Sequence, residues 1–203
     1  MNNCIFTPHC TEVMCDKSCP VLVETSYLLE RNGITMNNPV FKLVNDKRIN
    51  LESINKFIAD CENSTNLIGI CKTKNTIRSA EILTYVAICN NWKGSRLHCN
   101  VYNLKYSKFI EDTKQSWTTK TDPDALEYMR IWSNTAKVLI ISNMDYVNFK
   151  DFECQTLLSL IQTRQSAHLP TLIVIPESTL VGDSKFLGKL TSIFKESEVS
   201  IRI

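Results

Sequence analysis

The stretch Val138-Leu-Ile-Ile-Ser-Asn-Met-Asp-Tyr146 decides the fold class. Its run of apolar residues, Val138 to Ile141, indicates a strand that is buried on both faces, as the strands of parallel sheets are. Similar apolar runs occur elsewhere in the chain, at residues 66–71, 97–102 and 171–175. We therefore expect four buried strands, the third of them at residues 137–141.

The segments between these strands are long enough to form crossover helices. They lie at residues 79–90, 104–117 and 149–167. Alternation of buried strands with helices is typical of right-handed β-α-β units, which build a parallel sheet. The sequence thus predicts an α/β domain whose parallel sheet is flanked by helices.

Size and composition fit one such domain with a small appendage. The chain has 203 residues, 43% of them hydrophobic and 22% charged, with a formal charge of +2. This is ordinary globular composition and gives no sign of a large basic surface. No stretch approaches the roughly 20 apolar residues that cross a bilayer, and the first residues lack the features of a signal peptide, so we expect a cytoplasmic protein.

The front of the chain differs from the rest in its cysteines. A short helix is expected from Pro20 to the helix stop Asn32-Gly33, and another helix is expected at residues 51–61. Residues between them have little periodicity. We place a cysteine-rich module at residues 1–34, a linker at 35–50 and the α/β domain at 51–203.

The spacing of the first four cysteines predicts a metal site. The pattern is Cys4-x5-Cys10-x4-Cys15-x3-Cys19, with His9 as an alternative ligand. Tetrahedral zinc accepts four thiolates or three with one histidine, and binding would fold a segment too short for its own core. A [4Fe–4S] cluster is the alternative, because the spacing is not the usual C-x2-C and Pro20 follows the last cysteine. The other cysteines lie in apolar runs and are expected to be reduced and buried.

The first buried strand leads into the position of a phosphate loop. The motif G-x-x-x-x-G-K-[ST] matches at Gly69 and Thr76, but Lys74 replaces its second glycine and Asn75 replaces its lysine. A glycine allows the backbone to wrap phosphates, and a lysine offsets their charge. We expect ATP not to bind there, the alternative being weak binding through Lys72 or Lys74 in an altered loop.

The third strand ends in neutral residues where an ATPase of this type carries acids. Ser142 and Asn143 occupy the positions expected to hold Mg²⁺ and to polarise water, and neither can do so strongly. Asp145 lies two residues further on and is expected to be a loop acid. Both halves of a nucleotide site are thus altered together, and we expect no enzymatic activity.

These residues resemble the DnaC and DnaI type of bacterial and phage helicase loaders, within the AAA+ ATPases. The resemblance covers roughly residues 50–203 and is strongest from the Val138–Val147 strand, through Phe152-Glu153 and Arg164, to Pro170-Thr-Leu-Ile-Val-Ile175. It implies an AAA+-like sheet, with Ser178 near the sensor position of the family and Lys189 near an arginine-containing helix. A zinc-binding front domain that docks on the helicase also agrees with the family.

The resemblance implies a binding role in DNA replication. We expect a non-catalytic adaptor, of phage or mobile-element origin, that binds a replicative helicase, its loader or another AAA+ protein, and that can form an oligomer. The alternatives are a weak ATPase loader and an inhibitor that mimics a loader. Lysines and arginines mix with aromatics at residues 91–98 and 105–109, as on surfaces that bind single-stranded DNA, although we favour a solvated rim as the interpretation of these segments.

Overall fold

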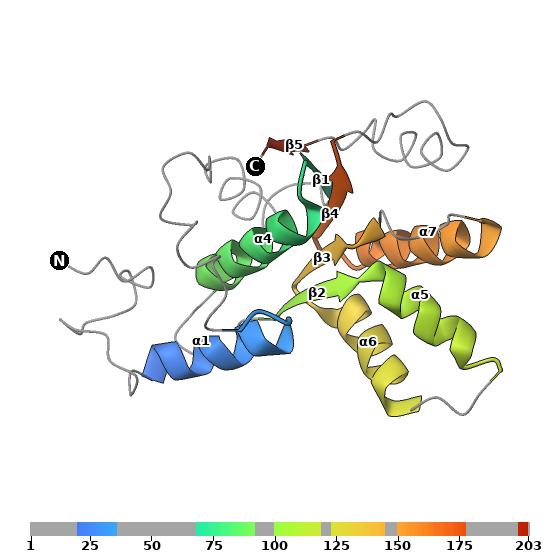
Figure 1. Cartoon of the computed structure of the whole chain (residues 1–203), viewed down its shortest axis with the longest axis horizontal. Coiled ribbons are helices and arrows are strands. Elements are labelled where there is room, and N and C mark those ends of the chain that lie inside the picture. Colours follow the sequence, from blue (N-terminus) through green and yellow to red (C-terminus); the bar gives the residue numbers. More distant parts are fainter. Residues whose placement is uncertain are drawn as a thin grey trace.

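The computed structural model describes residues 20–35, 68–91, 100–118, 123–144, 150–177 and 199–202. Within these ranges the chain forms one parallel sheet with helices on both faces (Figure 1). The strands are β1 (Ile68–Thr73), β2 (Val101–Lys105), β3 (Val138–Ser142), β4 (Thr171–Pro176) and β5 (Val199–Arg202). The predicted α/β class and the four predicted buried strands are confirmed, and β5 was not expected.

The strand order is β2-β3-β4-β1-β5, and every pair is parallel. After β1 the chain crosses to β2 at one edge, whereas after β4 it passes to β5 on the far side of β1. The connections that follow the neighbouring strands β1 and β4 thus run in opposite directions across the sheet. In open parallel sheets a crevice for ligands forms outside the carboxyl ends of the strands at such a point.

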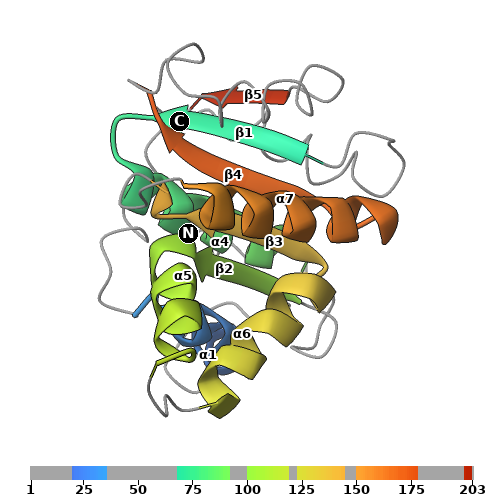
Figure 2. The same ribbon diagram turned by 90° about the vertical axis from the view of Figure 1, so that its right-hand side faces the viewer.

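Helices α4 (Thr76–Asn91) and α1 (Pro20–Arg31) cover one face of the sheet. Helices α5 (Tyr106–Gln115), α6 (Pro123–Thr135) and α7 (Asp151–Ser166) cover the other (Figures 1 and 2). Alternate residues of a strand point to opposite faces, so every second apolar residue of β1 to β4 enters the core beneath α5, α6 and α7. That core contains Ile70, Leu104, Ile141, Ile173 and Leu157.

Helix α6 was missed in the sequence, although Pro123 at its first position and Asp124 in its first turn are helix-start signals. Its apolar residues do not all lie on one stripe. Leu126 is buried and Met129 and Trp132 pack against the core, whereas Tyr128 and Ile131 are exposed outside that stripe.

Helix α1 ends where the sequence predicts. Gly33 has φ +76°, its N–H donates to the carbonyl of Glu30, and the N–H of Ile34 donates to the carbonyl of Leu29. These two bonds form a Schellman motif, which glycine favours because it has no Cβ.

The end of α1 contacts β2, the edge strand of the sheet. The carboxamide of Asn32 donates to the carbonyl of Val101 at 3.2 Å and accepts from the N–H of Asn103 at 2.6 Å. The Arg31 guanidinium also donates to the carbonyl of Val101, at 3.1 Å. The end of α1 therefore fills part of the hydrogen-bonding edge of β2. The domain boundaries stay predictions.

No helix in the described ranges combines the length and the apolar character needed to span a membrane.

Candidate nucleotide site at the carboxyl edge of the sheet

The link between β1 and α4 is a tight turn. β1 ends at Thr73 and α4 begins at Thr76, so only Lys74 and Asn75 connect them. A phosphate loop needs several residues between strand and helix, because successive backbone N–H groups must curve around the phosphates. Two residues cannot make that curve.

Side chains close this turn on itself. The backbone N–H of Asn75 donates to Oγ1 of Thr73 at 3.2 Å, and Oδ1 of Asn75 accepts from the N–H of Arg78 at 2.9 Å. Asn75 is therefore the N-cap of α4 and occupies one of the N–H groups that an anion would use. The hydroxyls of Thr73 and Ser79 are 2.7 Å apart and join the strand to the first helical turns.

Gly69 does not begin a loop, which corrects the sequence prediction. It lies inside β1, buried, and pairs with Leu172 on one side and Val199 on the other. The strand continues four residues beyond it, because Cys71 and Thr73 pack under α4. Motif matching could not detect this, since a glycine in a strand and a glycine in a loop look alike in sequence.

Lys72 and Lys74 lie in different surroundings. Lys72 lies within β1, half-buried, and by alternation shares its face with Ile68 and Ile70, opposite to α4. Lys74 is exposed in the turn beside Thr76, which is buried at the first position of α4. Only Lys74 thus lies beside the amino end of α4.

The end of β3 holds a neutral polar pair. The hydroxyl of Ser142, 1% exposed, lies 2.7 Å from Oδ1 of Asn103 on β2 and donates to it. Asn143 follows with φ +57°, a left-handed conformation that asparagine tolerates better than most residues. Ser142 and Asn103 are both uncharged, and the Ser142 hydroxyl already donates its hydrogen bond to Asn103. Asp145 lies outside the described residues.

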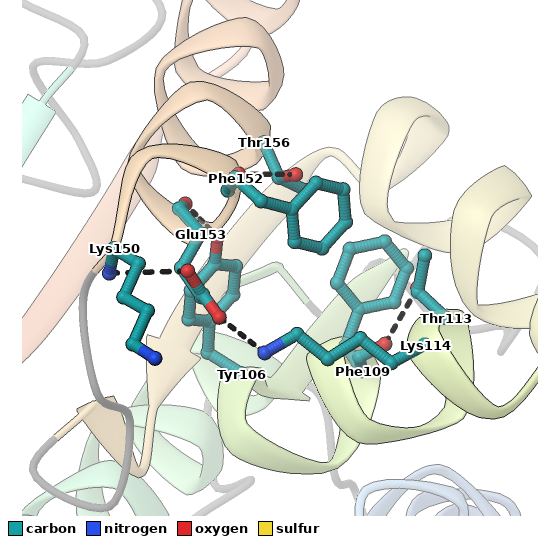
Figure 3. A network of polar contacts seen from close by, with 8 residues as sticks. All are labelled: Tyr106, Phe109, Thr113, Lys114, Lys150, Phe152, Glu153 and Thr156. Atoms are coloured by element: carbon teal, nitrogen blue, oxygen red, sulfur yellow. Dashed lines mark hydrogen bonds and ion pairs between the residues drawn. The ribbon is translucent and has the colours of Figure 1, made fainter.

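A buried carboxylate lies nearby, at the amino end of α7 (Figure 3). Glu153, 2% exposed, forms an ion pair with Lys114 of α5 and accepts from the N–H of Lys150 at 3.1 Å. The hydroxyl of Tyr106 donates to the Glu153 carbonyl at 2.6 Å. Burial raises the pKa of Glu153, but the bonds from Lys114 and Lys150 outweigh it and hold that pKa below its ordinary value.

This network ties α5 to α7 through the Lys114–Glu153 ion pair and the Tyr106 hydroxyl. The Tyr106 ring is fully buried, which raises the pKa of its hydroxyl. The sequence had included Glu153 only as part of a family pattern, and nothing in it marked Lys114 as the partner.

The described residues include no group of three or more His, Cys, Asp or Glu side chains placed to hold a metal ion. The predicted ligands Cys4, Cys10, Cys15, Cys19 and His9 lie outside the described residues, as do Ser178 and Lys189. Among the other cysteines, Cys71 and Cys154 are reduced and buried, as expected, and burial raises the pKa of the Cys71 thiol to about 12.

The aromatics at residues 105–109 do not form a base-stacking surface. Tyr106 and Phe109 are 0% and 7% exposed and belong to the core under α5. Stacking on a base requires an open ring face. Most of the other mixed segment, residues 91–98, lies outside the described residues.

No family model and no curated protein matches this sequence. Solved structures do match. One is the replication initiator DnaA bound to AMPPCP and single-stranded DNA, with a TM-score of 0.53, 12% identity, and coverage of 75% of this chain and 45% of that one. Another is a DNA replication initiation factor, with a TM-score of 0.53, 14% identity, and coverage of 87% and 50%.

The chain has an AAA+ fold. It spans about half the length of the matching structures. At such low identity the similarity concerns the fold, and the chemistry has to be argued from the residues described above.

Proposed function

We propose that this chain is a non-catalytic, helicase-loader-like adaptor in DNA replication, which binds a replicative helicase, its loader or another AAA+ protein. The observation that carries the proposal is the two-residue link Lys74-Asn75 between β1 and α4. An AAA+ sheet that lacks a phosphate loop can keep its shape and its protein-binding surfaces without binding or hydrolysing ATP.

The neutral pair at β3 supports the same conclusion independently. Mg²⁺ is held through carboxylates, and attack by water needs a base. The hydroxyl of Ser142 instead donates to the carboxamide of Asn103. Restoring an acid at residue 142 alone would bury an unpaired charge beneath α4, which is costly.

The fold supports the assignment to replication. Its matches include the initiator DnaA bound to AMPPCP and single-stranded DNA, and a DNA replication initiation factor. We infer a place in the same process for this chain, with a protein as its main partner and single-stranded DNA as a secondary one.

Thermal unfolding with and without Mg²⁺–ATP tests the absence of a working site. A dissociation constant of about 0.1 mM would stabilise the protein by about 2.3 kcal/mol at roughly 5 mM ATP. We expect no shift of Tm and no hydrolysis above background. A clear shift with hydrolysis would contradict the adaptor proposal.

The second candidate is a weak ATPase that uses Lys74, and it rests on that exposed lysine beside the amino end of α4. It predicts hydrolysis that disappears in the double variant Lys72→Ala/Lys74→Ala. Lys108→Ala is the matched control, because Lys108 is an exposed lysine on α5 with a side chain 65% exposed.

The partner is tested with purified proteins. The tagged chain is mixed with the replicative helicase of its host, with the loader and with both, and co-elution is measured by size-exclusion chromatography. Co-elution with one of them is expected. If the chain elutes alone in every mixture, the assignment to helicase loading is wrong even if ATP binding is absent.

A further inference from the structure

Exposed apolar side chains gather on two helices of the described structure. Val23 and Tyr27 on α1 are 55% and 53% exposed, and Tyr128 and Ile131 on α6 are 42% and 51% exposed. Soluble proteins rarely display several large apolar side chains together without a use for them.

One direct contact, between Arg31 and Trp132, joins these two helices. The Arg31 guanidinium lies 4.0 Å from the centre of the Trp132 ring, and the rings of Tyr128 and Trp132 are 5.7 Å apart. Tyr27 precedes Arg31 by one helical turn. We call these four residues, with Ile131, the α1–α6 surface.

The α1–α6 surface is held in place from below. Arg31 donates to the carbonyl of Val101, and Asn32 bonds to both Val101 and Asn103. An arginine that is fixed in this way loses little side-chain entropy on binding, and arginine, tyrosine and tryptophan are the residues that dominate the energetics of protein interfaces.

The charges beside the aromatics are mainly acidic. Glu30 follows Tyr27 by three residues, Glu127 precedes Ile131 by four, and both are exposed. The Arg31 charge is already engaged with Trp132 and Val101. Two exposed cations lie at the margins: Arg130 is about 60° around α6 from Glu127, on the side away from Ile131, and Lys105 lies beside Gly33 after the end of α1. A partner therefore meets aromatic rings bordered by carboxylates.

We infer that the α1–α6 surface docks a cationic amphipathic helix of a protein partner. The apolar face of such a helix covers Tyr27, Tyr128 and Ile131. Its lysines or arginines reach Glu30 and Glu127 and lay their aliphatic stems along the aromatic rings. This inference rests on the proposed adaptor function and specifies the surface that the adaptor uses.

Charge also argues against other occupants. Nucleic acid would bring phosphates next to Glu30 and Glu127, and a protein binds it chiefly through lysines and arginines. A second copy of the chain placed against the same surface would bring like carboxylates together, which disfavours association.

Fluorescence anisotropy with two labelled synthetic peptides tests the inference on the full-length chain. Both peptides have about 20 residues, enough for an isolated helix, and the same leucine positions, but one carries lysine and the other glutamate on its polar face. We expect the lysine peptide to bind at least about tenfold more tightly than the glutamate peptide, and less tightly in higher salt.

Variants locate the binding. Tyr27→Ser/Tyr128→Ser is expected to weaken binding of the lysine peptide at least about tenfold, as loss of two interface aromatics does. Glu30→Lys/Glu127→Lys is expected to reverse the preference between the peptides. Ile77→Ser is the matched control, because Ile77 is 47% exposed on α4, outside the α1–α6 surface. Melting curves confirm that each variant is folded.

Three results of the peptide test overturn the inference. They are equal binding of both peptides, no binding of either peptide up to about 0.2 mM, and an equal loss of lysine-peptide binding in Ile77→Ser. A dissociation constant of about 0.2 mM is weak even for a transient contact. A dimer in sedimentation that Tyr128→Ser disrupts would assign the surface to a second copy instead. The ATP measurement is independent of all of these, so a failed peptide test leaves the absence of a nucleotide site standing.

Discussion

At the scale of single residues, two buried charged side chains hold the helices in place by different means. Glu153 has a cationic partner in Lys114. Arg164 is 0% exposed and has no carboxylate partner among the described residues. It donates instead to the hydroxyl of Thr171 and to the carbonyls of Ser133 and Pro170, at 2.6–2.9 Å.

Replacing Arg164 by alanine should destabilise the fold severely. It removes a donor from the carbonyls of Ser133 and Pro170 and from the Thr171 hydroxyl, although the N–H of Leu139 still donates to Pro170, and it opens a cavity where α6, α7 and β4 meet. We expect a loss of about 3 kcal/mol in the free energy of unfolding, measured by urea denaturation. Arg130→Ala, at an exposed arginine of α6, should stay within about 0.5 kcal/mol of the parent protein. Similar losses of unfolding free energy in Arg164→Ala and Arg130→Ala would show that the buried hydrogen bonds of Arg164 do not stabilise the fold.

Glu153 should make stability depend on pH in the acid range. Its folded pKa lies below the ordinary value of 4.5, so on acidification the unfolded chain takes up the proton first. The stabilisation is fully present above that value and is lost as the pH falls through the folded pKa. Glu153→Gln should cost about 2 kcal/mol at neutral pH, and this difference should shrink as the pH falls further below 4.5. A constant difference in urea denaturation over this range would contradict the assigned ion pair.

At the scale of elements, the end of α1 protects an edge of the sheet. The Asn32 carboxamide takes one carbonyl and one N–H of β2, as the backbone of a neighbouring strand would. Exposed strand edges pair with other chains, and proteins commonly cover them. The Asn32 side chain therefore occupies hydrogen-bonding groups of β2 that another strand could otherwise pair with.

Asn32→Ala should weaken the fold and open that edge. We expect a loss of about 2 kcal/mol, because the N–H of Asn103 loses its acceptor while the Val101 carbonyl keeps only the Arg31 guanidinium, together with concentration-dependent self-association in sedimentation velocity. Gly33→Ala is the comparison, because it strains the same helix end at φ +76° but leaves the Asn32 contacts possible. It should cost about 1 kcal/mol without self-association. If both variants associate alike, the loss of helix α1 rather than the open edge is responsible.

At the scale of the whole molecule, the cysteine module and the AAA+ sheet should be separable in their metal dependence. We expect about one zinc ion per chain by elemental analysis, lost in the triple variant Cys10→Ser/Cys15→Ser/Cys19→Ser. Because no metal-holding group occurs among the described residues, the sheet should keep its far-ultraviolet circular dichroism without metal. Absorbance near 400 nm with iron in place of zinc would assign the alternative iron–sulfur cluster. Collapse of the whole spectrum on metal removal would contradict independent folding of the sheet.

The sequence alone determined the α/β class, the four buried strands and the end of α1 at Gly33, because these features depend on neighbouring residues. An apolar run such as that from Val138 to Ile141 predicts a buried strand whatever surrounds it. The altered residues Asn75 and Ser142 were equally visible, since each is read from a short motif.

Only the tertiary structure decided which residues meet. Strand order and register place Gly69 inside β1, pair Ser142 with Asn103, and bring Asn32 to β2 across about 70 residues of chain. The contact of Arg31 with Trp132 arises in the same way. Such contacts follow from how the helices pack on a twisted sheet, and no local pattern contains that information, because each partner has an ordinary sequence context.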